Sequence, residues 1–268
     1  MKYALGNMLN GASVKSIDSN AKAYIDAVIA SGVSVTGSQK TAISSFVTSE
    51  KIANRWNSHK QIYFPIWASA SANAICMKTL GVGTFVNSPT MSAGYVQGNG
   101  STQVFSMAAA PSTLGLTTSA AGAWALIKLA DSRTTSVDYI ASTTGGGLRL
   151  RKIASDIFDF RLGTNNVQVG LANALQNGVL HSTVFGGNLF HHRRNSSGIT
   201  QLANTAFTSA GTVPTSPCKA MGFDININAS DAQFGGFGLN AGFSASDVVS
   251  FTLNLKNLWE TCTGLSLP

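Results

Sequence analysis

Carboxylate side chains come first, because glycoside hydrolysis needs two of them on either side of the scissile bond. The chain has only 11 Asp and Glu residues among 268, and no Glu in the region of predicted strands. The pairs that could share one face are Asp156 with Asp159 and Asp224 with Asp231. The structural interpretation, which we prefer, makes Asp156 a turn residue and places Asp159 at a solvated strand position. We therefore expect no catalytic residue and a protein that is not an enzyme.

Motifs for other reactions are equally sparse. The sequence has neither the G-x-S-x-G motif of serine hydrolases nor a Walker loop. Residues 236–241 match G-x-G-x-x-A, but this fingerprint binds a dinucleotide only when a further parallel strand follows the helix. Residues 242–268 hold a helix and leave no room for that strand. We interpret these glycines as structural and expect no cofactor.

Histidine is the most common ligand for metals, and the chain has four: His59, His181, His191 and His192. Neighbouring residues on a strand point to opposite faces, so His191 and His192 cannot hold one ion together. No further Cys, Asp or His stands beside them at ligand spacing. We therefore expect no metal site.

The strongest charge feature is a group of basic residues, which has two interpretations. A group of cations can be the solvated face of a sheet, or a patch that binds an acidic partner surface or an anionic glycan. Direct nucleic-acid binding is the weakest interpretation, because clustered phosphate contacts and interleaved stacking aromatics are missing. The candidate patch consists of Arg149, Arg151, His191, Arg193 and Arg194.

The elements that must position these residues begin with helices. Residues 20–30 have apolar side chains at helical spacing. Thr36 and Gln39 form a capping box, and the helix behind them is predicted to continue to about residue 62. Ser244 and Asp247 form a second capping box before an amphipathic helix over 244–262. On the second helix, an apolar stripe is the predicted docking surface for another protein: Ile43, Phe46, Val47 and Trp56.

From about residue 68 the apolar period changes to two, which is typical of strands. Short alternating segments separated by Gly, Asn, Ser and Thr predict an antiparallel β-sandwich rather than βαβ units. The domains expected are a helical segment over 1–67 and a β-sandwich over 68–268, closed by helix 244–262. The predicted strands cover 94–97, 103–107, 123–129, 137–142, 148–153, 157–162, 178–184, 189–193, 199–203, 221–227 and 233–239.

Composition limits the remaining possibilities. Lys and Arg number 18 against 11 acidic residues, a net charge of +7, yet only 11% of residues are charged. The 44% hydrophobic content argues against global disorder. No apolar run is long enough to cross a membrane, and the N-terminus does not read as a cleaved signal. The three cysteines, Cys76, Cys218 and Cys262, are widely spaced, so we expect free thiols in a protein made in a reducing cytoplasm.

The layout resembles virion structural proteins of tailed bacteriophages, especially those of Bacteroidota hosts. The resemblance lies in a helical leader at 24–30, 36–42 and 46–47, in the Gly-Asn-Gly-Ser turn at 98–101, and in the phrase at 237–247. It implies a mainly β fold, a concanavalin A-like (laminin G-like) jelly-roll sandwich with helices at both ends. It carries no catalytic, calcium-binding or cofactor residue to this sequence.

The function that follows is non-enzymatic: a capsid decoration, head-fibre or tail module that acts through protein–protein contacts in the virion. Its expected partners are other virion proteins in a multi-copy assembly, with no membrane insertion and no direct nucleic-acid contact. The alternative is a carbohydrate-binding module that contacts a glycan of the host surface. Made in the bacterial host cytoplasm, the protein would end in the virion.

Overall fold

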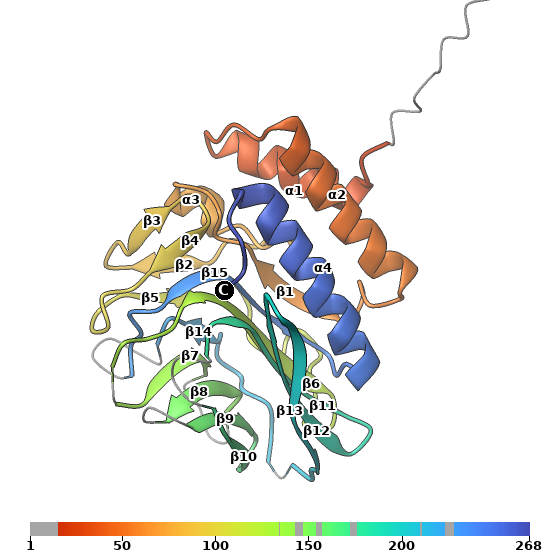
Figure 1. Cartoon of the computed structure of the whole chain (residues 1–268), viewed down its shortest axis with the longest axis vertical. Helices are drawn as coiled ribbons and strands as arrows, with labels where there is room; N and C mark the ends of the chain where they lie inside the picture. The colour runs from red at the N-terminus through yellow and green to blue at the C-terminus, as the bar shows by residue number, and fades with distance from the viewer. Residues whose placement is uncertain are drawn as a thin grey trace, which may run out of the picture.

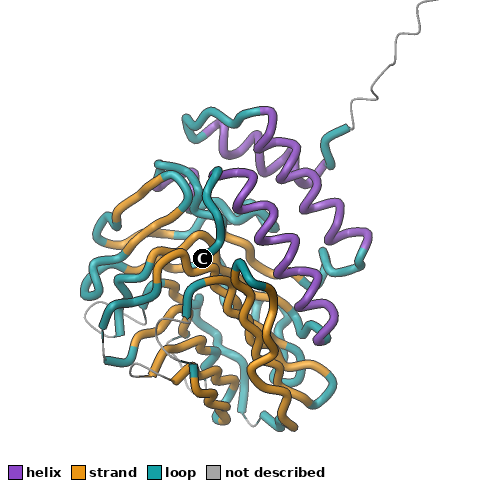
Figure 2. The backbone as a smooth tube through the Cα atoms, viewed as in Figure 1, coloured by secondary structure: helices purple, strands orange, loops and turns teal. Residues whose placement is uncertain are grey.

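The computed structural model describes residues 16–133, 135–142, 147–153, 157–171, 176–209, 211–222 and 228–268. Two antiparallel sheets pack face to face, and three helices lie against the outer side of one sheet (Figure 1). Figure 2 shows the helices gathered on one side of the strands. These helices are α1 (Ser19–Ala30), α2 (Gly37–Ile52) and α4 (Ala245–Thr263); a fourth, α3 (Ala70–Asn73), is a single turn. This architecture confirms the predicted fold class, a mainly β sandwich with helices.

The first sheet carries the helices. Its strands run in the order β13-β12-β11-β6-β15-β4-β3, and β1 also pairs with β15. The long central strands are apolar on both faces because one face packs on the second sheet and the other on the helices. The bounds are β1 (His59–Tyr63), β3 (Thr90–Ser92), β4 (Tyr95–Gln97), β6 (Ala121–Leu129), β11 (Gly178–Phe185), β12 (Asn188–Asn195), β13 (Gly198–Ala206) and β15 (Gln233–Asn240).

The second sheet closes the sandwich on the side away from the helices. Its order is β10-β9-β8-β7-β14-β5-β2, and every described pair in it is antiparallel. Strand β8 alternates between partly exposed and buried residues, as its sequence predicts. On β9 Asp159 is fully buried between Phe158 and Phe160, which corrects the solvated position predicted for it. The bounds are β2 (Thr84–Val86), β5 (Val104–Ser106), β7 (Val137–Ala141), β8 (Arg149–Ile153), β9 (Ile157–Leu162), β10 (Asn165–Gly170) and β14 (Lys219–Ala220).

Both predicted capping boxes are present, and they fix where α2 and α4 begin. The Thr36 hydroxyl accepts from the Gln39 N–H, and the Gln39 side chain accepts from the Thr36 N–H. Ser244 and Asp247 make the same reciprocal pair at the start of α4. Gly264 follows the last residue of α4 and caps it, with a φ of 71° in the left-handed region that glycine tolerates.

The helical segment is shorter than its sequence predicts. α2 ends at Ile52 rather than near residue 62, and the chain then enters the first sheet as β1. β1 pairs with β15, so residues before the expected boundary at 67 already belong to the sandwich. The sequence also does not predict β2, β3, β10 or β14. Of the predicted strand 221–227, residues 223–227 lie outside the described residues. In the described part of the chain, no helix is both long and apolar enough to span a bilayer.

Two apolar cores result from this layering. One fills the space between the sheets with Phe105, Phe158 and Phe160 among its side chains. The other lies between the first sheet and the helices, where Trp124 of β6 packs against Phe251 of α4 with ring centroids 5.4 Å apart. The helix layer is therefore part of the folded core and not an appendage.

Candidate functional site: a groove between α2 and α4

Helices α2 and α4 lie side by side on the sheet, although they are far apart in sequence. Near the start of α2, the Gln39 amide donates to the Cys262 carbonyl at 3.0 Å. Near its end, the Asn254 amide donates to Glu50 Oε1 at 2.7 Å. These two hydrogen bonds hold the helices together at both ends of the groove between them.

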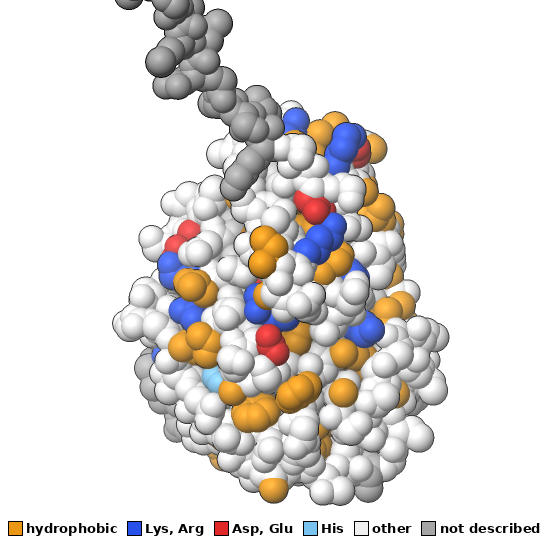
Figure 3. Space-filling model, turned by 90° about the vertical axis from the view of Figure 1, so that its right-hand side faces the viewer, with side chains coloured by type: hydrophobic (Ala, Val, Ile, Leu, Met, Phe, Trp, Pro, Cys, Tyr) orange, Lys and Arg blue, Asp and Glu red, His pale blue; other side chains and the backbone are white. Residues whose placement is uncertain are grey.

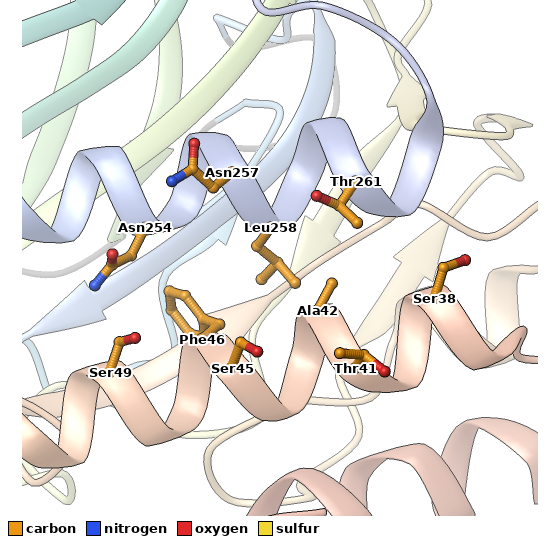
Figure 4. Close-up of a pocket in the computed structure, with 10 residues that line it drawn as sticks. All are labelled: Ser38, Thr41, Ala42, Ser45, Phe46, Ser49, Asn254, Asn257, Leu258 and Thr261. Carbon is orange, nitrogen blue, oxygen red and sulfur yellow. The ribbon is translucent and has the colours of Figure 1, made fainter. Parts of the chain in front are cut away.

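The groove has a volume of about 440 Å³, within the range of small-molecule sites. The side chains of Phe46 and Leu258 meet at its floor, and hydroxyl and amide groups stand along both helices (Figure 4). None of its lining residues carries a charge: Ser38, Thr41, Ala42, Ser45, Phe46, Ser49, Asn254, Asn257, Leu258 and Thr261.

Several of these polar groups are free to bind a ligand. The side chains of Ser45, Ser49, Asn257 and Thr261 have no hydrogen-bond partner within the described residues. Asn254 uses its amide nitrogen on Glu50, which leaves its carbonyl oxygen as an acceptor. The helices therefore present donors and acceptors on either side of an apolar floor.

A buried charge network fixes the Asn254 end of the groove. Glu50 is fully buried and accepts two hydrogen bonds from the Arg55 guanidinium, each at 2.8 Å. His59 Nε2 lies 3.0 Å from Glu50 Oε2. Burial alone would raise the pKa of Glu50, but the hydrogen bonds from Arg55, His59 and Asn254 outweigh it and lower the pKa to about 2. Glu50 is therefore ionised and positions the Asn254 amide.

This arrangement suits an uncharged ligand rich in hydroxyl groups. A sugar has an apolar C–H face that can pack on the floor, and hydroxyls that both donate and accept hydrogen bonds. Uncharged side chains and backbone cover most of the face that Figure 3 shows, with Lys and Arg scattered over it.

The predicted docking stripe on α2 is buried. Ile43 and Val47 are fully inaccessible, and Phe46 and Trp56 are 3% and 6% exposed. They pack within the core between the helices and the first sheet. This burial corrects the expectation that these four side chains form a surface for another protein, because one amphipathic stripe is satisfied within the chain itself.

The predicted basic patch is also corrected, because its members lie on different faces. Arg149 and Arg151 stand on the outer face of the second sheet, where each lies near a carboxylate. Arg149 is 3.7 Å from Asp138 and 3.4 Å from Asp159, and Arg151 is 3.5 Å from Asp138. Burial raises the pKa of Asp138, against the lowering effect of Arg151 and Arg149. Their positive charge is thus largely compensated within the sheet.

The other members of the predicted patch lie in the first sheet. His191 is buried between the sheets, where its Nδ1 lies 2.6 Å from the Ser182 hydroxyl. Arg194 lies beneath α4 and donates to the Thr252 hydroxyl at 2.9 Å. Arg193 lies two residues after His191 on the same strand, and its guanidinium donates to the Asn177 carbonyl. His191 and Arg194 therefore point to opposite faces of β12, and the predicted residues do not form one patch.

Within the described residues, no group of three His, Cys, Asp or Glu side chains is placed to hold a metal ion. Burial lowers the pKa of His181 to about 3 and that of His191 to about 4. Asp159 accepts from Asn166, and Asp231 accepts from Ser132. The partners predicted for these two carboxylates, at positions 156 and 224, lie outside the described residues.

Comparison with solved structures finds the same fold at low sequence identity. A mutant of Trypanosoma rangeli sialidase displaying trans-sialidase activity matches with a TM-score of 0.55 and 10% identity, over 81% of this chain and 39% of that chain. The botulinum neurotoxin serotype D binding domain matches with a TM-score of 0.53 and 10% identity, over 75% of this chain and 52% of that one. A structure of botulinum neurotoxin type C matches with a TM-score of 0.51 and 10% identity, over 76% and 53%.

The chain spans about half or less of the length of these structures, and at such identity the likeness shows the fold alone. No family model and no curated protein matches the chain.

These comparisons correct the expectation that the protein is not an enzyme. The fold occurs within a sialidase mutant with trans-sialidase activity, so a lack of familiar motifs does not place the chain among non-enzymes. Carboxylates that are distant in sequence can meet in an active site, so the lack of a pair at close spacing does not exclude catalysis.

Sequence reasoning also missed the groove. Its lining is composed of Ser, Thr and Asn, which occur throughout this chain and carry no motif. The one available signal was polar residues at three- and four-residue spacing on two predicted helices, such as Thr41, Ser45 and Ser49.

Proposed function

We propose that this chain is a carbohydrate-binding module and that the groove between α2 and α4 holds an uncharged saccharide. The observation that carries the proposal is the set of free hydroxyl and amide groups around an apolar floor, between two helices fixed at both ends. A rigid site of this kind orders few side chains when the ligand binds, which lowers the entropic cost of binding.

The groove supplies each contact that a sugar ring requires. Ala42, which is partly exposed, and the small accessible edges of Phe46 and Leu258 offer an apolar contact for the C–H face of the ring. The Asn254 carbonyl oxygen accepts from a sugar hydroxyl, because its amide nitrogen is committed to Glu50. Ser45 and Ser49 across the groove can donate or accept. Hydrogen-bonding groups on both walls then orient the ring.

The comparisons support a binding role of this class. One similar structure is a toxin binding domain, and another is of a toxin whose passage into cells depends on interaction with two ganglioside molecules. The fold is thus found in proteins that bind receptors of this kind. For this chain the ligand class remains our proposal and rests on the groove.

The sequence resemblance to phage virion proteins suggests the setting. In our proposal the module is carried in several copies on a virion, attached to other virion proteins, and contacts a glycan on the host surface. That setting rests on the resemblance alone. Detecting the protein in purified particles by mass spectrometry would test it.

A binding experiment tests the groove itself. A glycan array of neutral oligosaccharides would identify a ligand, and calorimetry would then compare Ser45→Trp with Thr48→Trp. Ser45 lines the groove, whereas Thr48 is exposed on the same helix and does not. We expect Ser45→Trp to abolish binding and Thr48→Trp to leave it unchanged. Asn257→Ala should weaken binding by about two- to tenfold, the value of one hydrogen bond.

Two outcomes would contradict the proposal. One is a neutral glycan that binds Ser45→Trp as tightly as the wild-type chain, which would place the site elsewhere. The other is an array without any neutral ligand, together with a protein partner whose binding Ser45→Trp abolishes. That result would assign the groove to a partner helix.

A further inference from the structure

A second cavity lies where the end of α2 meets the start of α1. Its volume is about 530 Å³. It shares no lining residue with the groove between α2 and α4. The residues around it are mostly amides and lysines: Asn20, Lys51, Asn54, Trp56, Asn57 and Lys78.

The cavity carries more positive charge than its surroundings neutralise. Lys51 forms an ion pair with Asp18, with Nζ 2.9 and 2.8 Å from the two carboxylate oxygens. Lys78 has no carboxylate partner in the described part of the chain, and its Nζ lies 4.5 Å from the centroid of the Trp56 ring. Lys60 on β1 is likewise without a partner there. Three ammonium groups therefore share one nearby carboxylate.

The electrostatic environment of Lys78 reflects this excess. Burial lowers the pKa of Lys78, and the neighbouring charges of Lys60 and Lys51 lower it further. The other acid in this region, Glu50, is buried and committed to Arg55, so it does not neutralise the lysines. An anion between the lysines would relieve their mutual repulsion.

The amide side chains supply the second half of a ligand site. Asn20, Asn54 and Asn57 are exposed, and none of the three side chains has a hydrogen-bond partner among the described residues. Asn54 has a φ of 58°, which turns the chain sharply after α2 and sets its side chain at the cavity. The first N–H groups of α1 are already capped by Asp18, so they take no part in binding.

We propose that this cavity is a second ligand site that binds the sulfate or phosphate ester of an acidic saccharide. Lysine ammonium groups act as compact point charges with three donors each, and such groups bind the oxygens of a sulfate or phosphate ester from several directions. The three amides bind the sugar hydroxyls beside that ester. That the ligand is a saccharide rests on the proposed function. That the cavity binds a sulfate or phosphate group is inferred from its lysines and is independent of that function.

The test uses three probes with the full-length chain: N-acetylglucosamine 6-sulfate, N-acetylglucosamine 6-phosphate and unmodified N-acetylglucosamine. NMR titration follows the side-chain amide signals of Asn20, Asn54 and Asn57. We expect the two esters to shift these signals and the neutral sugar to bind at least about tenfold more weakly, because a hydrogen bond to a charged group is lost. The two ester arms decide between sulfate and phosphate as the preferred group.

Two variants and a matched control complete the test. Lys78→Gln should weaken ester binding by about tenfold. Asn57→Asp, at an exposed position that tolerates substitution, should abolish it by placing a negative charge in the cavity. The control is Lys128→Gln, because Lys128 also lies over an aromatic ring, with its Nζ 4.3 Å from the Tyr95 centroid, but outside this cavity. It should leave binding unchanged.

The proposal is overturned if neither ester shifts the amide signals, or if Asn57→Asp binds the esters as the wild-type chain does. It is also overturned if Lys128→Gln loses as much affinity as Lys78→Gln, since binding would then follow net charge only. Ester binding that survives in Ser45→Trp supports a site separate from the groove. Ester binding without any neutral-glycan binding would leave this site standing and refute the groove proposal.

Discussion

Replacing Glu50 by Gln tests the buried network that joins α2 to β1 and α4. Glu50 has no solvent exposure and accepts hydrogen bonds from Arg55 and Asn254. Glutamine has nearly the same shape, but it loses the charge and turns one acceptor into an NH₂ donor. Both carboxylate oxygens accept from Arg55, so that donor would face the guanidinium in either orientation. The variant leaves the buried Arg55 with only the more distant Asp247, at 3.7 Å, as an acidic partner.

The expected loss can be estimated in two ways. The pKa of Glu50 falls from 4.5 to about 2 in the folded state. Because each pKa unit is equivalent to 1.36 kcal/mol, the ionised form stabilises the fold by about 3 kcal/mol. Removing one partner of a buried ion pair costs about 3–5 kcal/mol in other proteins. We expect Glu50→Gln to lower the free energy of unfolding by about 3 kcal/mol at neutral pH.

The pH dependence gives a sharper test than the magnitude. A carboxyl whose pKa is lowered on folding stabilises the protein above its unfolded pKa of 4.5, and this contribution is lost as the pH falls toward about 2. Urea denaturation of both proteins should therefore show a difference that shrinks across that interval. Asp26→Asn, which removes an exposed ion pair with Lys22, is the control and should cost less than about 0.5 kcal/mol. A Glu50→Gln protein as stable as the wild type at neutral pH would refute the reasoning.

Four further results are expected. Gly238→Ala should lower the melting temperature by several degrees or prevent folding, because its Cβ would lie 2.2 Å from the Gln61 carbonyl oxygen; an unchanged melting curve would show that β1 can move aside. Deletion of 244–268 should give an insoluble product in a sedimentation assay, since α4 covers the apolar face of the first sheet; a soluble, folded truncation would show that the sheet does not need it. Stability to urea should fall as the pH drops from 6.5 to about 4, because the folded state binds a proton at His191 more weakly than the unfolded chain does, and a His191→Gln variant should show a shallower fall. A thiol reagent should modify all three cysteines only after denaturation, since each is buried; reaction of fewer than three in denaturant without reductant would contradict this. The cysteines are Cys76, Cys218 and Cys262.

Local signals in the sequence predicted the parts of the fold that depend on neighbours in the chain. A capping box needs two side chains three residues apart, so Thr36 and Gln39 were sufficient to place the start of α2. Alternation along β8 and β9 predicted two strands with one buried face. β1 has no such alternation, because it is buried on nearly all sides and exists by pairing with β15. Its sequence by itself therefore predicts the end of a helix.

Charge and accessibility could not be predicted in the same way, because they depend on which segments meet. Arg149 and Arg194 look alike in the sequence, yet one lies beside two carboxylates on an outer sheet face and the other beneath α4. The groove joins residues of α2 and α4 that are 204 positions apart, as the bond from Asn254 to Glu50 shows. By itself the sequence determined the helix starts, the period of most strands and the class of the fold. Only the tertiary structure decided which apolar stripes are covered and where free polar groups gather, because burial is a property of packed surfaces and not of any local pattern.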